Sequence, residues 1–263
     1  MCSSDLDTSL KTDWKHFNDV LGGLQRGCLY IIAARPGDGK TDFALHLAVQ
    51  LAKRCRVDYR SLEMTKEQLV HRVLSRVCMI NSTRFRDHDL DENAQKRIGI
   101  AAARMGDLHL VMDDTPGVSA GDVEAKLASG KPDVMFIDYL GLMRGDAAGN
   151  KPLWQITGEI THALKESARR HGAAVVALVQ LARAADRQKE PALSDLKGGS
   201  DIEADADGVI FMRPQKTGEF LSGDDTWPVE AVIAKNRHGG VGRLRFNWQP
   251  QYHNYVPTDN TRR

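Results

Sequence analysis

An eight-residue segment in the N-terminal part of the chain has the composition of a loop that holds phosphate groups. The segment ARPGDGKT fits the pattern G-x-x-x-x-G-K-[ST], with Ala34 at the position of the first glycine. Backbone N–H groups must wrap the phosphate, which requires small residues, and the following helix must direct its positive end at the anion. In this pattern the Lys40 ammonium reaches the β- and γ-phosphates and the Thr41 hydroxyl binds Mg²⁺. The pattern therefore predicts a site for ATP and Mg²⁺ whose phosphates contact Ala34, Arg35, Pro36, Gly37, Asp38, Gly39, Lys40 and Thr41.

The alternative is an ordinary glycine-rich turn before a helix, and the flanking sequence argues against it. An apolar run at 28–33 precedes the loop and a buried-helix pattern at 42–53 follows it, as phosphate binding requires. Asp42 is expected beside the phosphates, where it either joins the site or caps the first helical turn. Asp138 ends the apolar run VMFID, and an aspartate opposite such a loop can hold Mg²⁺ through water. Strands that end in Asp are common, so Asp138 takes its significance from the upstream loop.

Apolar strand patterns alternate with helical patterns along most of the chain. Because such strands are joined by helices, the order predicts an α/β fold with a mainly parallel, twisted sheet flanked by helices. The last strands are joined by short turns, which predicts antiparallel strands at the C-terminal edge. Strands are expected at 28–33, 57–61, 108–112, 134–137, 173–179, 208–212, 229–234 and 244–248, and helices at 42–53, 65–78, 91–105 and 153–170.

The bulk composition is that of an ordinary globular protein and excludes several classes. The 263 residues suffice for one substantial domain, and the net charge of +1 gives no general signal of nucleic-acid binding. Any such binding must come from a local patch or loop. The 4 cysteines lack zinc spacing and are expected to be reduced thiols of a cytoplasmic protein. No apolar run approaches the roughly 18 residues of a membrane helix, so no membrane partner is expected.

Six segments in order resemble the motifs of the ATPase domain of DnaB-type replicative DNA helicases. The resemblance covers about 12–255 and is carried by LGGLQRGCLYIIAARPGDGKTDFALHLA, SLEMTKEQLVHR, VMFIDYLGLM, VVALVQLAR, LSDLKGGSDIEADADGVIFM and VIAKNRHGGVGRLRF. It implies a RecA-like P-loop NTPase fold and a helicase of the 5′–3′ type that hydrolyses ATP between the subunits of a homo-oligomer, a hexameric ring in the family. Residues 1–11 are expected to be a disordered or truncated arm and 256–263 a C-terminal tail.

The resemblance also implies roles for four residues outside the phosphate loop. Glu63 looks like the glutamate that polarises the attacking water, and its position after the second strand places it at the ligand-binding edge of the sheet. Gln180, after the strand AAVVALV, resembles the sensor of the γ-phosphate. Lys235 and Arg237 resemble the pair that reaches into the neighbouring subunit's ATP site, with Arg237 as an arginine finger. The alternative for this pair is a solvated basic turn.

The segment 195–207 resembles the loop that grips single-stranded DNA in the ring channel. One cation and several small residues suit contacts to the phosphate backbone, so the candidate DNA-binding residues are Lys197, Gly198, Gly199, Ser200 and Arg183. No aromatic residue interleaves them, which predicts sequence-tolerant, salt-sensitive binding. A charged surface loop without a ligand is the alternative.

One departure from the family limits what the resemblance implies. Only about twenty residues precede the ATPase core, so neither primase binding nor an N-terminal collar is expected to carry over. Two other functions stay open: a RecA-like recombination or repair ATPase that forms filaments on DNA, and a regulatory P-loop ATPase that acts on a protein partner. The late AKNR element and the hairpin after it favour the helicase.

Overall fold

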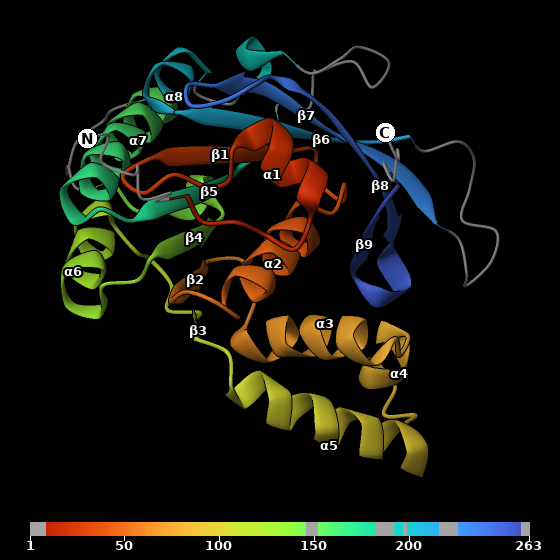
Figure 1. Cartoon of the computed structure of the whole chain (residues 1–263). Helices are drawn as coiled ribbons and strands as arrows, with labels where there is room; N and C mark the ends of the chain where they lie inside the picture. The colour runs from red at the N-terminus through yellow and green to blue at the C-terminus, as the bar shows by residue number, and fades with distance from the viewer. Residues whose placement is uncertain (1–8, 146–151, 182–191, 197–198, 216–225, 259–263) are drawn as a thin grey trace, which may run out of the picture.

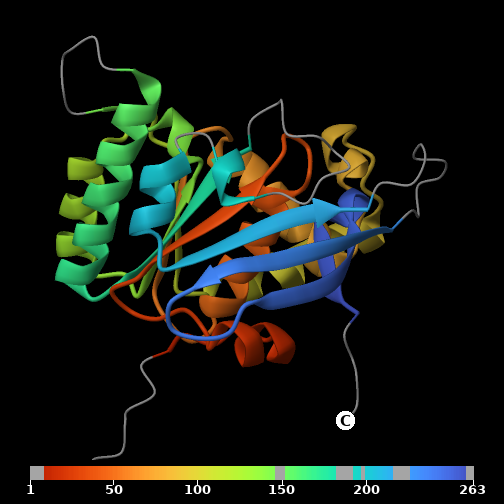
Figure 2. The same cartoon turned by 90° about the horizontal axis from the view of Figure 1, so that it is seen from above.

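The computed structural model describes residues 9–145, 152–181, 192–196, 199–215 and 226–258, which form a nine-stranded sheet with helices on both faces (Figure 1). Six strands are parallel, in the order β3 (Leu110–Asp113), β2 (Val57–Ser61), β4 (Val134–Asp138), β5 (Ala174–Gln180), β1 (Leu29–Ala34) and β6 (Gly208–Pro214). Antiparallel strands continue the sheet as β7 (Trp227–Asn236), β8 (Gly242–Gln249) and β9 (Asn254–Pro257). The whole sheet is strongly twisted when seen from above (Figure 2).

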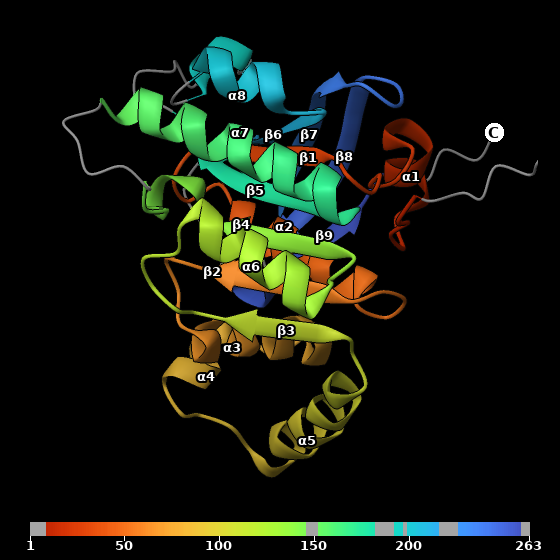
Figure 3. The same cartoon turned by 90° about the vertical axis from the view of Figure 1, so that its left-hand side faces the viewer.

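The two faces of the sheet carry separate hydrophobic cores. Along β1, Tyr30 and Ile32 face one core while Leu29 and Ile31 face the other, which explains why this strand reads as a continuous apolar run. The first core includes residues of α1 (Lys15–Leu21), α2 (Lys40–Leu51) and α3 (Lys66–Cys78). The second includes residues of α6 (Ala120–Gly130), α7 (Leu153–His171) and α8 (Gly199–Asp205), with α6 and α7 turned to the viewer in Figure 3.

A small helical unit projects from the side of the sheet that carries β3 (Figure 1). It consists of α3, α4 (Ser82–Arg86) and α5 (Glu92–Gly106), which share a third apolar cluster. Thr65 begins α3 with a capping box, and the Asp91 side chain caps α5 by accepting from the Ala94 N–H. These caps explain why both helices begin where the sequence predicts.

The predicted fold class is confirmed: the sheet is mainly parallel, helices flank it, and its C-terminal edge is antiparallel. Each predicted strand and helix is present with ends shifted by a few residues at most. Four α-helices (α1, α4, α6 and α8) and β9 were not predicted, and Leu10 pairs with Leu24 while β9 extends to Pro257. No helix among the described residues is long and apolar enough to span a bilayer.

Candidate nucleotide-binding site

The glycine-rich segment is the turn between β1 and α2. Gly37 and Gly39 both have left-handed backbone angles, with φ of 78° and 80°, so the chain can turn tightly and enter α2 directly at Lys40. The Asp38 N–H closes the turn by donating to the Arg35 carbonyl at 3.2 Å. The N-terminus of a twelve-residue helix thus stands directly behind the loop, as anion binding requires.

Alanine at position 34, where the phosphate-loop pattern has glycine, fits the structure without strain on the loop. It is the last residue of β1, is 0% exposed and packs in the first core, and its carbonyl accepts from the Leu181 N–H at 3.0 Å. Gln180 pairs with Ala34 across β1 and β5, at the same edge of the sheet. The candidate γ-phosphate sensor is therefore beside the start of the phosphate loop.

Two aromatic residues of the antiparallel strands, Trp248 in β8 and Tyr255 in β9, lie against the phosphate loop at Gly39. A Cβ added at Gly39 would lie 2.4 Å from the Tyr255 hydroxyl and 2.9 Å from Trp248, so a larger residue does not fit without movement. The Tyr255 hydroxyl donates to the Gly39 carbonyl at 3.2 Å. The rings of Trp248 and Tyr255 stack with centroids 5.9 Å apart. Strands β8 and β9 thus fix the conformation of a loop that is about 200 residues away in sequence.

Lys40 brings the predicted catalytic residues together. Its Nζ atom lies 3.3 Å from Asp138 Oδ1 and 3.6 Å from Glu63 Oε2, and 4.8 Å from the centre of the Tyr139 ring. Asp138 ends β4 and Glu63 follows β2, and these two parallel strands are neighbours. Their carboxyl ends therefore meet at the edge where the phosphate loop begins, which is the usual ligand-binding edge of such a sheet.

The Asp138 side chain is buried at this edge and is held by a hydrogen bond from Tyr59. It is 0% exposed, and its second oxygen accepts a hydrogen bond of 3.0 Å from the Tyr59 hydroxyl. Burial, and then the Asp138 carboxylate, raise the pKa of Tyr59 well above its ordinary value, so the hydroxyl remains a donor. Thr41, the next residue after Lys40 in α2, carries a hydroxyl group. A carboxylate and a hydroxyl oxygen fit the preference of Mg²⁺ for oxygen ligands.

The prediction for the Asp42 side chain is wrong. Its carboxylate is 3% exposed and accepts from Arg72 Nη1 at 2.6 Å and Trp248 Nε1 at 3.2 Å, and it lies 3.1 Å from His253 Nδ1. Arg72 comes from α3 and Trp248 from β8, so Asp42 joins three elements inside the protein rather than facing the phosphates. Burial raises the pKa of the Asp42 carboxyl, but Arg72 and His253 outweigh it and hold the pKa below its ordinary value.

The Asp42→Asn variant is expected to lose about 3 kcal/mol of unfolding free energy at neutral pH, because a buried ion pair loses one partner. The pKa of Asp42 is lower in the folded state than its ordinary value of 3.8. Its contribution is therefore complete above that value and declines as the pH falls below it. Denaturant unfolding at neutral and acidic pH measures the difference. Asp19→Asn, on the exposed side of α1, is the control, and a difference from wild type that does not change with pH would contradict the assignment.

Lys235 and Arg237 lie at the opposite edge of the sheet from the phosphate loop, where the parallel strand β1 begins. Gly208, which begins β6, pairs with Tyr30 at the start of β1 and with Asn236 at the end of β7. Along β1 this edge is roughly 15 Å or more from the phosphate loop. The two cations therefore do not lie beside the phosphate loop of their own chain.

The candidate DNA-binding residues are only partly described. Arg183, Lys197 and Gly198 lie outside the described residues, whereas Gly199 and Ser200 begin α8. The segment 195–207 was predicted as a loop, and this is corrected: it holds α8 and the end of a 3₁₀ turn at Leu193–Asp195. The helix was missed because glycine and serine at its start resemble loop residues, although both are common where helices begin.

Other residues of the site were not predicted from the sequence. Tyr59 and Tyr139 contact Asp138 and Lys40, and Trp248 and Tyr255 support the loop. Tyr59 could have been recognised in the sequence, because a tyrosine inside a buried strand needs a hydrogen-bond partner for its hydroxyl group. The distant aromatic pair has no sequence signal, because only the tertiary fold brings it near Gly39.

Comparison with known proteins identifies the family. The sequence profile of the family described as DnaB-like helicase C terminal domain matches residues 9–257. The chain is 33% identical to the replicative DNA helicase DnaC of Bacillus subtilis over 257 residues, which are 95% of the chain and 56% of that protein. It is 32% identical to the replicative DNA helicase DnaB of Geobacillus stearothermophilus, with the same coverage. The chain thus spans little more than half of these relatives.

Solved structures agree with the sequence match. One solved structure, described as an ATPase domain, superposes with a TM-score of 0.86 at 28% identity, covering 95% of this chain and 91% of that one. Another, described as a DnaB-like replicative helicase and its interactions with primase, superposes with a TM-score of 0.85 at 27% identity, covering 95% of this chain and 62% of that one. By profile match, identity and fold, the chain belongs to the family of DnaB-like helicase C-terminal domains.

Proposed function

We propose that this chain is the motor domain of an ATP-dependent replicative DNA helicase, which works in the cytoplasm as a ring of identical subunits. The observation that supports this most directly is the division of the catalytic groups between two edges. Lys40, Glu63 and Asp138 meet beside the phosphate loop, whereas Lys235 and Arg237 lie at the opposite edge. A complete site needs both sets, so one subunit must supply the second set to its neighbour.

Each residue has a defined task in this proposal. Lys40 and Gln180 contact the γ-phosphate, while Thr41 and Asp138 hold Mg²⁺, which neutralises charge on the phosphates when bound. Glu63 is 48% exposed and accepts a proton from, or orients, the attacking water. These residues, the neighbour's pair and the loop backbone then surround the triphosphate.

The partner of the motor is single-stranded DNA. We propose that Arg183 and the segment Lys197, Gly198, Gly199 and Ser200 contact its phosphates in the centre of a hexameric ring that moves in the 5′–3′ direction. The unit responsible is a single RecA-like ATPase domain, which extends slightly beyond the predicted bounds of 12–255, from the pairing of Leu10 with Leu24 to the end of β9 at Pro257. Because the contacts are to phosphates, binding should weaken steeply as salt rises.

The first test is ATP hydrolysis with and without single-stranded DNA, followed by unwinding of a duplex with a 5′ tail. DNA should raise the turnover rate, and electron microscopy should show closed rings. Hydrolysis that DNA does not affect would replace the helicase with a regulatory ATPase acting on a protein. Filaments along DNA in place of rings would favour a recombination ATPase.

The Glu63→Gln variant is expected to bind ATP normally but to turn it over about 10²-fold more slowly, because it keeps the shape of the side chain and loses its basicity. Steady-state hydrolysis and binding of a fluorescent ATP analogue measure the two effects. Glu67→Gln is the matched control, since Glu67 is exposed in the first turn of α3. Equal turnover rates of the two variants would remove Glu63 from the mechanism.

A further inference from the structure

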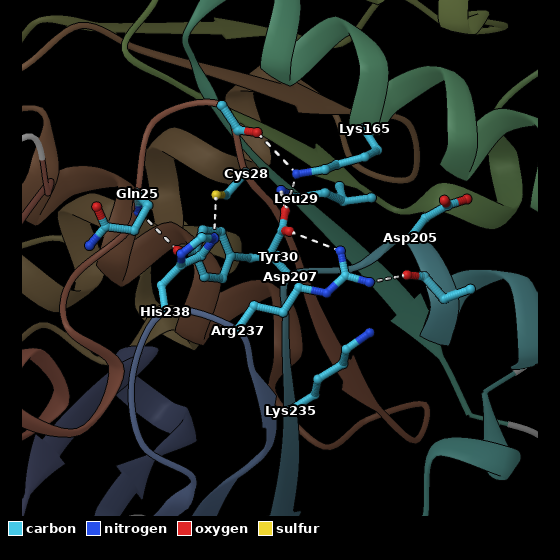
Figure 4. A network of polar contacts seen from close by, with 12 residues as sticks. Gln25, Cys28, Leu29, Tyr30, Lys165, Asp205, Asp207, Lys235, Arg237 and His238 are labelled. Carbon is cyan, nitrogen blue, oxygen red and sulfur yellow. Dashed lines mark hydrogen bonds and ion pairs between the residues drawn. The ribbon is translucent and has the colours of Figure 1, made fainter.

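A buried carboxylate lies at the edge of the sheet that carries Lys235 and Arg237 (Figure 4). Asp207, between α8 and β6, has a side chain that is only 3% exposed. Its Oδ2 atom accepts from the Leu29 N–H at 2.8 Å and from Lys165 Nζ at 2.5 Å. Lys165 also donates to the Gly27 carbonyl at 3.1 Å. The carboxylate is thus fixed to the start of β1 and to α7, and its other oxygen, Oδ1, faces Arg237.

Three hydrogen bonds hold Arg237 to Asp207 and to α8. Its backbone N–H donates to the Asp207 carbonyl at 2.8 Å, and its Nη1 atom lies 3.4 Å from Asp207 Oδ1. Its Nη2 atom donates to the Ala204 carbonyl at 2.6 Å. The side chain nevertheless stays 46% exposed, so these contacts fix the guanidinium group while leaving part of it open to another subunit.

The last turn of α8 also holds Lys235. The Lys235 ammonium donates to the Glu203 carbonyl, the neighbour of the carbonyl that accepts from Arg237. Carbonyls in the last turn of a helix have no partner within the helix and carry its negative end, so cations are stabilised there. The two cations proposed to act on another subunit are therefore positioned by the same helix end.

The surroundings of Asp207 argue against its use as a metal ligand. Cys28, Asp207 and His238 place one potential metal ligand each within 4.8 Å of one another. Two cations, Lys165 and Arg237, already contact the carboxylate, and a divalent ion there would meet their repulsion. Burial, and then Asp207, raise the pKa of the Cys28 thiol to about 11, so it stays protonated rather than becoming a thiolate ligand.

We propose that Asp207 is a positioning residue for hydrolysis in the neighbouring subunit: with the last carbonyls of α8, it holds Arg237 in the orientation that the neighbour's ATP site requires. This inference rests on the proposed function, in which Arg237 completes a neighbour's site. A free arginine would have to lose the mobility of its long side chain each time the site assembles, and an arginine already fixed avoids that cost. Misplacement of a charged group by about 1 Å is enough to lower a rate by roughly 10²-fold.

The test is the Asp207→Asn variant in the full-length assembly. Its kcat for ATP hydrolysis is expected to fall by about 10²-fold. Affinity for a fluorescent ATP analogue should change far less than kcat, because Arg237 offsets charge that develops mainly in the transition state. Asp205→Asn is the chemical control, since this nearby carboxylate at the end of α8 pairs with His162 and not with Arg237. Lys165→Gln is the stability control, because it removes the other cation of Asp207 and leaves the contacts of Arg237 in place.

The Arg237→Ala background separates positioning from general damage. If Asp207 acts through Arg237, Asp207→Asn should reduce kcat no further in that background. A second, multiplicative loss would overturn the inference, as would a kcat loss by Lys165→Gln equal to that of Asp207→Asn at a similar melting temperature. Full activity of Asp207→Asn beside an inactive Arg237→Ala would refute the inference alone. Full activity of Arg237→Ala would refute the function proposed for the arginine.

Discussion

Replacing Arg237 with alanine is expected to lower kcat for ATP hydrolysis by about 10³-fold or more, the effect of removing an arginine that offsets charge on a transferred phosphoryl group. Nucleotide affinity should change far less than kcat, because the arginine offsets charge that develops mainly in the transition state. Steady-state hydrolysis at saturating ATP, beside titration with a fluorescent analogue, measures both quantities. Arg243→Ala is the matched control: Arg243 lies on the adjacent strand β8, and its side chain is 47% exposed against 46% for Arg237.

Mixing two inactive variants tests whether the arginine acts across a subunit boundary. An Arg237→Ala subunit keeps an intact phosphate loop with Lys40, and a Lys40→Ala subunit keeps Arg237. When the two are mixed in one ring, some sites pair an intact loop with an intact arginine. Turnover is therefore expected to reappear on mixing, although each variant alone is inactive. Mixed rings, verified by pull-down of differently tagged subunits, that remain inactive would show that Arg237 serves its own chain or only the fold.

The meeting of Lys40, Glu63 and Asp138 at one edge of the sheet could be predicted from the sequence, because each residue lies at or just after the end of a strand or its following loop. Lys40 follows β1, Glu63 follows β2 and Asp138 ends β4. Once the strands are parallel, their carboxyl ends must share one edge, so local patterns are enough to bring the three side chains together. The distances of 3.3 Å and 3.6 Å around the Lys40 ammonium agree with this reasoning.

The residues that support the site could not be predicted in this way. Asp42 was expected to join the phosphate site or to cap the first helical turn, yet its carboxylate bonds to Trp248 and His253, which are 206 and 211 residues away. No local pattern encodes contacts of that separation, since they exist only after β8 and β9 have packed against α2. The same holds for Asp207, whose sequence neighbours gave no sign that it would contact Arg237, 30 residues later.

Replacing Lys40 with alanine is expected to reduce kcat/KM for ATP by about 10³-fold or more, through both binding and chemistry. The loss exceeds that of one contact because two carboxylates stay behind. The Lys40 ammonium lies between Asp138 and Glu63, and without it both would face the incoming triphosphate as unpaired negative charges. Hydrolysis over a range of ATP concentrations gives kcat and KM separately, and both are expected to worsen.

Lys53→Ala supplies the control, because Lys53 lies just beyond the other end of α2, is 50% exposed and pairs with Asp13 at 2.6 Å. It should hydrolyse ATP like the wild type. The fold of Lys40→Ala should survive, since Asp138 keeps its hydrogen bond from Tyr59. If repulsion by the carboxylates left behind causes part of the loss, adding Glu63→Gln to Lys40→Ala should recover some nucleotide affinity without recovering turnover, as an amide does not repel phosphate. An affinity of the double variant no higher than that of Lys40→Ala would refute the repulsion.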